Sequence, residues 1–387
     1  MSSLRFALVI GFAVALFPAV MLPPGQGRAQ MESRCDNCHT MHNSQANQPM
    51  GPGPYEVLLR MDCIACHTGT NTGQPGATPF VFEAGAGEPM YPEGTAGTTG
   101  NTLAGGNFYW VAQGMDHAGH NVEGIALLGS SSPPGVGPDN PLEGVSQIRC
   151  AGTYGCHGNL GEEVPIRAMR HTHHYNDKSV WKNGLTAAGS YRFLLGVQGF
   201  GAADYEYRPT SSSHNKYWGK DRSDEMDPAD NPEDNDGGTI SAHCARCHEN
   251  FHHGPNSLAP TAGQVPGGGT GINPGTGVWV RHPVDYDMTK ANRGMLLSSE
   301  YINYNYPNEI GGDPEYSVIA PLAVSGEHNR NTTVQSAIFA VDDDAIIMCL
   351  TCHRAHGTPY ASALRWNYRG WPAAGFDGCS ICHSTKD

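Results

Sequence analysis

The longest apolar stretch of the chain lies at its amino terminus, over residues 6–21, and is interrupted by Pro18. Arg5 supplies a basic start, and residues 27–29 (Gly-Arg-Ala) form a small-x-small cleavage signature. The run is short for a transmembrane helix and contains a proline. It predicts a cleaved secretory signal peptide over residues 1–29. The mature chain is then exported, to the cell surface, the extracellular space or the periplasm, with no membrane anchor left after cleavage.

Beyond residue 29 the hydrophobic periodicity is weak and local. Residues 342–356 predict the clearest helix, because acidic N-cap candidates precede it and Gly357 and Pro359 stop it. Shorter helices are expected over 55–67 and around 190–195. Alternation of apolar and polar residues predicts short strands at 277–282 and 301–306.

Composition explains why so few elements are predicted. The 387 residues include 50 Gly and 28 Pro, and tracts such as 69–106 and 257–277 carry turn residues with little periodicity. On composition alone such tracts could be disordered. An additional source of buried apolar surface is therefore needed to hold the chain together.

A repeated cysteine motif supplies that source. Six cysteines are followed directly by histidine, each has a second cysteine a few residues earlier, and the pairs use all 12 cysteines. Random placement would give roughly one such dipeptide or fewer. Five of the six read C-x-x-C-H, the attachment signature of c-type haem, in which the thiols bind the porphyrin and the histidine is the proximal iron ligand.

We number these motifs in chain order, each by its two thioether cysteines and its proximal histidine. They are motif 1 (Cys35, Cys38 and His39), motif 2 (Cys63, Cys66 and His67), motif 3 (Cys150, Cys156 and His157), motif 4 (Cys244, Cys247 and His248), motif 5 (Cys349, Cys352 and His353) and motif 6 (Cys379, Cys382 and His383). The sequence therefore predicts six covalently bound haem c groups.

Two other uses of the cysteines are weaker. Structural zinc would not require histidine after every second cysteine. A disulfide across two residues is strained and closes too small a loop to stabilise a fold. Motif 3 is the exception, because five residues separate Cys150 from Cys156 and a small disulfide loop is feasible there. His157 stands where the proximal ligand belongs, and this favours haem at motif 3 as well.

Six covalently bound haem groups predict the fold class: a mostly irregular, coil-rich multihaem cytochrome, with a few short helices and minor β-hairpins wrapped around a haem chain. The residues at 277–282 and 301–306 could equally pack on haem faces instead of forming strands. Residues 30–387 are expected to form a single domain, with possible halves 30–220 and 237–387. The acidic segment 221–236 between them lacks EF-hand ligand spacing, which favours a solvated turn over a calcium site.

The charge balance limits the choice of partners. Without Arg5 and Arg28, 21 basic residues face 37 acidic ones, a formal charge of −16 for the mature chain. Nucleic acid is excluded as a partner, because the phosphate backbone calls for a basic face. Other redox proteins or extracellular electron acceptors are compatible with the charge.

The 19 histidines exceed the six that the motifs use as proximal ligands. Three candidates for the distal position lie just after a motif: His42, His252 and His356. Residues three or four apart on a helix share one face, so such a pair cannot approach one iron from opposite sides. Each of the three must therefore serve a different haem from its neighbour, which draws two haems together.

Other distal candidates are His120, beside His117; His173 or His174, beside His171; and His282. His214, His243 and His328 are interpreted as bystanders. Methionine is a competing ligand, but the 13 methionines have no distinctive placement. The sequence thus favours six bis-histidine haems. A domain of this size has a radius of gyration of roughly 20 Å, so the haems must lie within electron-tunnelling reach of one another.

Several segments resemble the doubled-CxxCH multihaem cytochromes, which include extracellular filaments of the OmcE and OmcS kind. They are the sequence around His42, Gly-His120-Asn-Val, residues 191–196 and residues 349–360. The resemblance implies stacked bis-histidine haems and a homopolymer in which the haem chain continues between subunits. It also implies that His42 ligates a haem of a neighbouring subunit. The spacer before Cys156 departs from the family pattern.

Two further functions compete with a filament subunit. A soluble periplasmic electron shuttle is not separated from it by sequence. A multihaem reductase of the nitrite or hydroxylamine type needs a haem with an open distal face, which such enzymes commonly mark with C-x-x-C-K. No C-x-x-C-K occurs, and histidines are in surplus. We therefore expect an electron-transfer protein and no catalytic residues.

Overall fold

A computed structural model describes about half of the chain. The described residues are 44–45, 48–49, 62–83, 89–91, 102–127, 141–145, 147–175, 180–220, 238–248, 284–287, 316–326, 330–336, 345–367 and 378. Statements about structure below refer to these residues.

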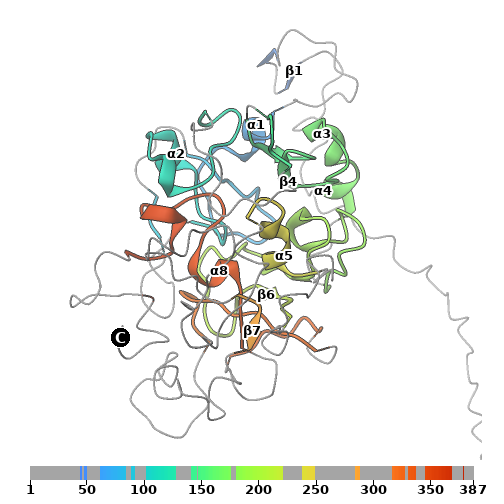
Figure 1. Cartoon of the computed structure of the whole chain (residues 1–387), viewed down its shortest axis with the longest axis vertical. Helices are drawn as coiled ribbons and strands as arrows, with labels where there is room; N and C mark the ends of the chain where they lie inside the picture. The colour runs from blue at the N-terminus through green and yellow to red at the C-terminus, as the bar shows by residue number, and fades with distance from the viewer. Residues whose placement is uncertain are drawn as a thin grey trace, which may run out of the picture.

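Helices in the described part of the chain are single turns or little more (Figure 1). The α-helices are α1 (Ile64–His67), α2 (Tyr109–Ala112), α3 (Pro165–Ala168), α4 (Thr172–Tyr175), α5 (Ile240–Ala245) and α8 (Cys349–Cys352). Three short 3₁₀ turns accompany them: η2 (Asp116–Ala118), η3 (Tyr191–Phe193) and η6 (Ala361–Ala363). Isolated helices of this length are not stable in water, so the surrounding structure must hold them.

The strands of the described residues form four two-stranded sheets. β1 (Ser44–Gln45) and β2 (Gln48–Pro49) make an antiparallel hairpin, whereas β3 (Arg149–Ala151) and β4 (Gly155–His157) are parallel. β5 (Gly199–Phe200) pairs antiparallel with β6 (Lys216–Tyr217), and β7 (Tyr286–Asp287) with β8 (Ile346–Ile347). This architecture confirms the predicted coil-rich fold with short helices and minor hairpins.

The long helix predicted over 342–356 is wrong in extent. Ile346 and Ile347 form β8, and the helix is confined to the four residues of α8. Both isoleucines are buried and β-branched, and they pair with β7, so a distant strand overrides the local helical signal. The acidic N-cap candidates lie outside the described residues.

The helix expected around 190–195 is also wrong. It is one 3₁₀ turn in which Arg192 and Phe193 have φ of 47° and 63°, left-handed values that interrupt a helix. Of the predicted helix 55–67, the last four residues form α1 and residues 55–61 lie outside the described residues. The predicted strands 277–282 and 301–306, the signal peptide and the acidic segment 221–236 lie outside them too.

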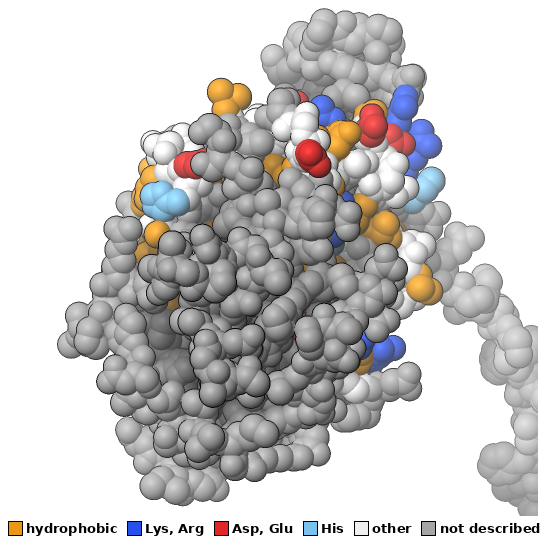
Figure 2. All heavy atoms as spheres, viewed as in Figure 1, with side chains coloured by type: hydrophobic (Ala, Val, Ile, Leu, Met, Phe, Trp, Pro, Cys, Tyr) orange, Lys and Arg blue, Asp and Glu red, His pale blue; other side chains and the backbone are white. Residues whose placement is uncertain are grey.

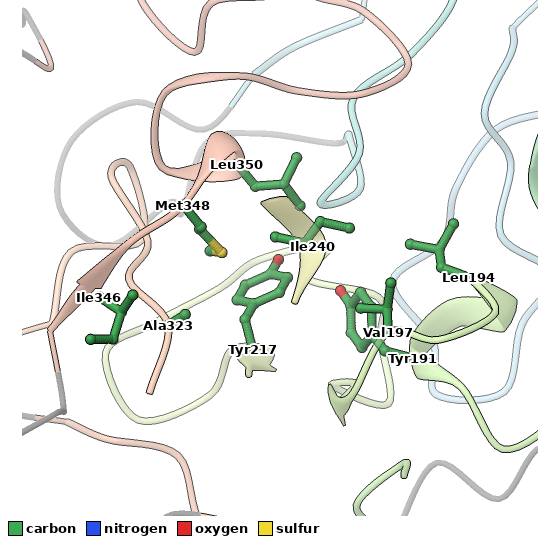
Figure 3. Close-up of a cluster of buried hydrophobic side chains, with 9 residues drawn as sticks. All are labelled: Tyr191, Leu194, Val197, Tyr217, Ile240, Ala323, Ile346, Met348 and Leu350. Carbon is green, nitrogen blue, oxygen red and sulfur yellow. The ribbon is translucent and has the colours of Figure 1, made fainter. Parts of the chain in front are cut away.

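Two small apolar clusters make up the described core. Figure 3 shows the larger one, in which Tyr217 of β6 lies between Ile240 of α5 and the chain around Ala323. Its members are Tyr191, Leu194, Val197, Tyr217, Ile240, Ala323, Ile346, Met348 and Leu350. It therefore joins residues from both sides of the acidic segment 221–236. The second cluster surrounds Tyr316, Ile319 and Trp366, and Cys352 packs against it.

The visible part of the described surface mixes charges of both signs, as Figure 2 shows at one end of the molecule. Within the described ranges, the one ion pair joins Arg149 to Glu123 at 3.0 Å. No helix among the described residues has the length and apolar character needed to cross a membrane.

Candidate functional site

Four of the six cysteine motifs lie among the described residues, and three of them are built on a helical turn. Motif 2 spans α1 from its N-cap, Cys63, to its last residue, His67. Motif 4 begins in the last turn of α5, and both cysteines of motif 5 lie in α8. In each, the backbone N–H of the histidine donates to the carbonyl of the first cysteine, at 3.0 Å. One helical turn thus presents both thiols and the imidazole to the same side.

Motifs 1 and 6 cannot be placed in the same way. Cys35, Cys38 and His39 of motif 1 lie outside the described residues. Cys379, Cys382 and His383 of motif 6 lie outside them as well. The local structure of these two motifs is therefore left out of the description below.

Motif 3 uses a different local structure. Its cysteines sit on β3 and β4, which run parallel with Ala151 opposite His157. The chain doubles back between them through Gly152, whose φ is +87°, and Gly155, where a Cβ would stand 2.5 Å from the Arg149 carbonyl oxygen. The five-residue spacer is therefore a tight double turn, which Gly can adopt without a side-chain clash.

The eight described cysteines are all free thiols, so the disulfide considered for motif 3 is not formed. They are Cys63, Cys66, Cys150, Cys156, Cys244, Cys247, Cys349 and Cys352. Cys66, the second thiol of motif 2, is half-buried on α1, next to the proximal His67. Each described motif thus keeps two thiols available for thioether bonds to a porphyrin.

Thiols of different motifs also meet. Cys63 and Cys150 hydrogen-bond to each other, and so do Cys244 and Cys349. Within the described residues, no group of three or more His, Cys, Asp or Glu side chains could hold a metal ion. The contacts between thiols bring motifs together without forming a metal cluster there.

Histidine side chains meet in pairs instead. The ring centroids of His67 and His173 are 6.3 Å apart, as are those of His157 and His356. His120 and His248 are 6.0 Å apart. Each pair joins the histidine that ends a motif to one of the distal candidates from a remote part of the sequence.

These separations fit a metal between the rings. An imidazole nitrogen binds a metal at about 2.0 Å, so two such rings on opposite sides place their centroids about 6.3 Å apart. The rings are tilted by 35° to 52°, so stacking does not explain the pairs. The donor set at motifs 2, 3 and 4, two thiols and two imidazoles each, is that of a covalently bound bis-histidine haem.

The tautomers of the histidines agree with ligation through Nε2. Nδ1 donates to a backbone carbonyl in His67 (Pro79, 2.7 Å), His120 (Ala355, 2.6 Å), His157 (Arg192, 3.0 Å) and His353 (Ser362, 2.8 Å). Because a carbonyl can only accept, the proton is on Nδ1 and the Nε2 lone pair is free to bind a metal. Such bonds also fix the ring orientation.

His173 has the same tautomer, but its Nδ1 donates to a side chain and not to a backbone carbonyl. Thr172 Oγ1 donates its proton to the Met169 carbonyl at 2.8 Å, which leaves this oxygen as the acceptor for His173 Nδ1 at 3.1 Å. Nε2 of His173 therefore also carries its lone pair. The backbone N–H of His356 donates to the carbonyl of Gly105 at 2.7 Å, and its ring packs closely on Gly105, where a Cβ would stand 2.8 Å from Nδ1. Nδ1 of His356 is buried without a hydrogen-bond partner.

Burial keeps several of these imidazoles neutral. It lowers the pKa of His173 to about 4 and that of His356 to about 3, with the neighbouring histidines adding to the effect. It also lowers the pKa of His157 and His353. A neutral imidazole is the form that binds a metal, so these groups are ready ligands near neutral pH.

The other candidates behave differently. His117, His171 and His174 are exposed. His214, interpreted as a bystander, is buried, and both of its ring nitrogens lie within hydrogen-bonding distance of carbonyls, of Asn215 and Gln335. The predicted ligands His39, His42, His252, His282 and His383 lie outside the described residues, as does His328.

His243, interpreted as a bystander from the sequence, lies between two motifs. It precedes Cys244 directly, its Nε2 is buried without a hydrogen-bond partner, and burial lowers its pKa to about 3. It hydrogen-bonds to the backbone of Cys156 and so connects motifs 3 and 4.

Comparisons with known proteins agree with this chemistry. Residues 340–387 match the family model described as "Doubled CXXCH motif". The C-type cytochrome OmcS of Geobacter sulfurreducens is 24% identical over 388 residues, covering 87% of this chain and 79% of that protein. The solved Outer Membrane Cytochrome S Filament from the same organism aligns with 18% identity over 88% of this chain and 85% of that one, with a TM-score of 0.47.

The doubled motif, the similarity to a c-type cytochrome along most of the chain and the facing imidazoles lead to one conclusion. Residues 340–387 carry a doubled CXXCH motif, and along most of its length the chain resembles the multihaem c-type cytochrome OmcS.

Proposed function

We propose that this protein is a hexahaem cytochrome that transfers electrons over long distances by an outer-sphere route, as a polymerising subunit of an extracellular filament. The observation that carries the proposal is the set of three facing imidazole pairs, His67–His173, His157–His356 and His120–His248. An iron held between two imidazoles has no open position for a substrate. The bound haem would supply one-electron chemistry, and the protein's own residues bind and orient it.

Contacts between motifs support a continuous electron path. Motif 2 meets motif 3 at Cys63 and Cys150, and motif 4 meets motif 5 at Cys244 and Cys349. Arg246 of motif 4 donates to the carbonyls of Gly155 (3.2 Å) and Thr153 (3.4 Å) in motif 3. Motifs 2 to 5 therefore touch in sequence order, and we assign the same order to their haems.

The distal ligands connect the motifs further, because ligands of different haems lie on one short segment. His353 is the proximal ligand of motif 5, whereas His356, three residues later, faces His157 of motif 3. Nδ1 of His120, which faces motif 4, donates to the carbonyl of Ala355 in the same segment. One short stretch of backbone after motif 5 is thus tied to the ligands of three haems.

Filament formation rests on the similarity to OmcS, of which a filament structure is known. In this proposal the signal peptide directs export, and the haem row continues from one subunit to the next. His42 would then ligate a haem of the neighbouring subunit.

Two measurements test the proposal. Intact mass should give six haems per mature chain, and electron microscopy of the purified protein should show ordered fibres that the His42→Ala variant does not form. Monodisperse monomers under all conditions would contradict the filament and leave a soluble shuttle. A high-spin haem that binds nitrite or hydroxylamine would instead favour a reductase.

A further inference from the structure

Two arginines beside motif 5 are buried without any carboxylate partner. Arg354 is 4% exposed and Arg365 is 6% exposed. Within the described residues, neither makes an ion pair. Arginine keeps its charge in proteins, and a buried charge without a counter-ion is strongly unfavourable. Both positions therefore call for an anion.

Backbone carbonyls satisfy only part of each guanidinium group. Nη1 of Arg354 donates to the carbonyls of Leu103 (3.1 Å) and Ala104 (3.0 Å), but its Nε is buried without a partner. Nε of Arg365 donates to the carbonyl of Leu350 at 2.6 Å, but its Nη2 is likewise buried without a partner.

A third donor lies next to them. Trp366 is 5% exposed, and its Nε1 also has no hydrogen-bond partner. Cys352 packs against the cluster that contains this tryptophan. Three donor groups without partners thus follow closely after the second cysteine of motif 5.

Glu206, Asp285 and Asp287 are the buried carboxylates among the described residues. Of these, Glu206 is the one whose charge acts on Arg354, and it is used elsewhere. Oε1 of Glu206 accepts from the backbone N–H of Asn215 at 2.7 Å. Its charge raises the pKa of Arg354, but less than burial and the charge of Arg365 lower it. Glu206 therefore compensates the charge of Arg354 only in part, and in the described part of the chain it forms no ion pair with either arginine.

The position of both arginines points to the group that motif 5 binds. Arg354 follows His353 directly, and the backbone N–H of Arg365 donates to the carbonyl of Cys352 at 2.8 Å. Haem carries two propionate carboxylates, whose planar geometry matches the guanidinium fork. We infer that Arg354 and Arg365 are positioning residues that receive the propionates of the haem at motif 5. The inference rests on the proposed function, because it requires haem at this motif.

The positive charge of the arginines should affect the reduction potential of the motif 5 haem, and this effect tests the inference. A nearby positive charge favours the reduced haem, since reduction removes one positive charge from the iron. Replacing either arginine by glutamine should disfavour reduction of the motif 5 haem at least tenfold, which is about 59 mV for a one-electron couple. The lysine variants keep the charge and should stay within about threefold of the wild type.

Spectroelectrochemistry of the full-length protein measures these potentials, with Arg170→Gln as the control, because Arg170 is exposed. The variant that carries both Cys349→Ala and Cys352→Ala lacks the motif 5 haem and so identifies its midpoint potential. This midpoint potential is the one that should shift in the glutamine variants. Unchanged potentials in folded Arg354→Gln and Arg365→Gln would overturn the inference while leaving the proposed function intact. Absence of haem from motif 5 by mass would instead overturn the proposed function.

If a glutamine variant does not fold, the lysine variants decide. Resonance Raman spectra report the propionate bending modes, which depend on the donor that binds the carboxylate. A shifted bending mode in Arg354→Lys or Arg365→Lys supports the contact. A spectrum identical to that of the wild type in both contradicts it.

Discussion

His120 and His117 lie three residues apart and offer a sharp test of the imidazole pairs. The ring of His120 is 6.0 Å from that of His248, and its Nδ1 donates to the Ala355 carbonyl at 2.6 Å. His117 is exposed, on the short turn η2. The sequence offers both as candidates, whereas the structure places only His120 opposite a motif histidine.

Replacing His120 by alanine should open the distal side of the motif 4 haem and make it high-spin. With six haems, the expected high-spin fraction is about one sixth of the total. The loss of the hydrogen bond to Ala355 should cost about 1 kcal/mol of unfolding free energy. His117→Ala should leave both the spin state and the stability unchanged.

Electron paramagnetic resonance of the oxidised variants gives the high-spin fraction by integration. Free imidazole added to His120→Ala should bind the open position and restore the low-spin signal. If His120→Ala stays entirely low-spin with unchanged midpoint potentials, His120 is not a ligand and the pairing is wrong.

Three further predictions concern other parts of the chain. Joint replacement of Cys150 and Cys156 by alanine should remove one haem by intact mass, and an unchanged count would exclude haem from motif 3. Gly105→Val should push the ring of His356 aside, because a Cβ there stands 2.8 Å from Nδ1, and should create one high-spin haem. Burial lowers the pKa of Lys216 to about 8 from 10.5, so the unfolded chain binds more protons than the folded one between these pH values. The free energy of unfolding should therefore rise with pH in that window, by about 1 to 2 kcal/mol after solvent screening. Chemical denaturation should show this rise in the wild type and not in Lys216→Met.

The sequence predicted the fold class but not the extent of its elements. Gly- and Pro-rich composition and six haem motifs are properties of the whole chain, and they predict a coil-rich fold directly. The extent of α8 depends on Ile346 and Ile347 pairing with β7, and the turn at 191–193 depends on left-handed residues. Both are set by distant parts of the chain, which local periodicity does not report.

The candidate site could also be predicted only in part from the sequence. The motifs can be read from spacing alone, because two thiols and a histidine on one short segment are a local requirement of haem attachment. The choice of His173 over His174 depends on which ring the fold brings opposite His67. The unpaired donors of Arg354 and Arg365 become visible only once burial and hydrogen bonds are known.

We propose that imidazoles close both axial positions of every haem, so that the protein transfers electrons and does not bind substrate at iron. Electron paramagnetic resonance of the fully oxidised wild-type protein tests this most directly. The account predicts low-spin ferric signals that integrate to six haems per chain. A high-spin signal of one sixth of the haem or more, converted by an added small ligand, would contradict it.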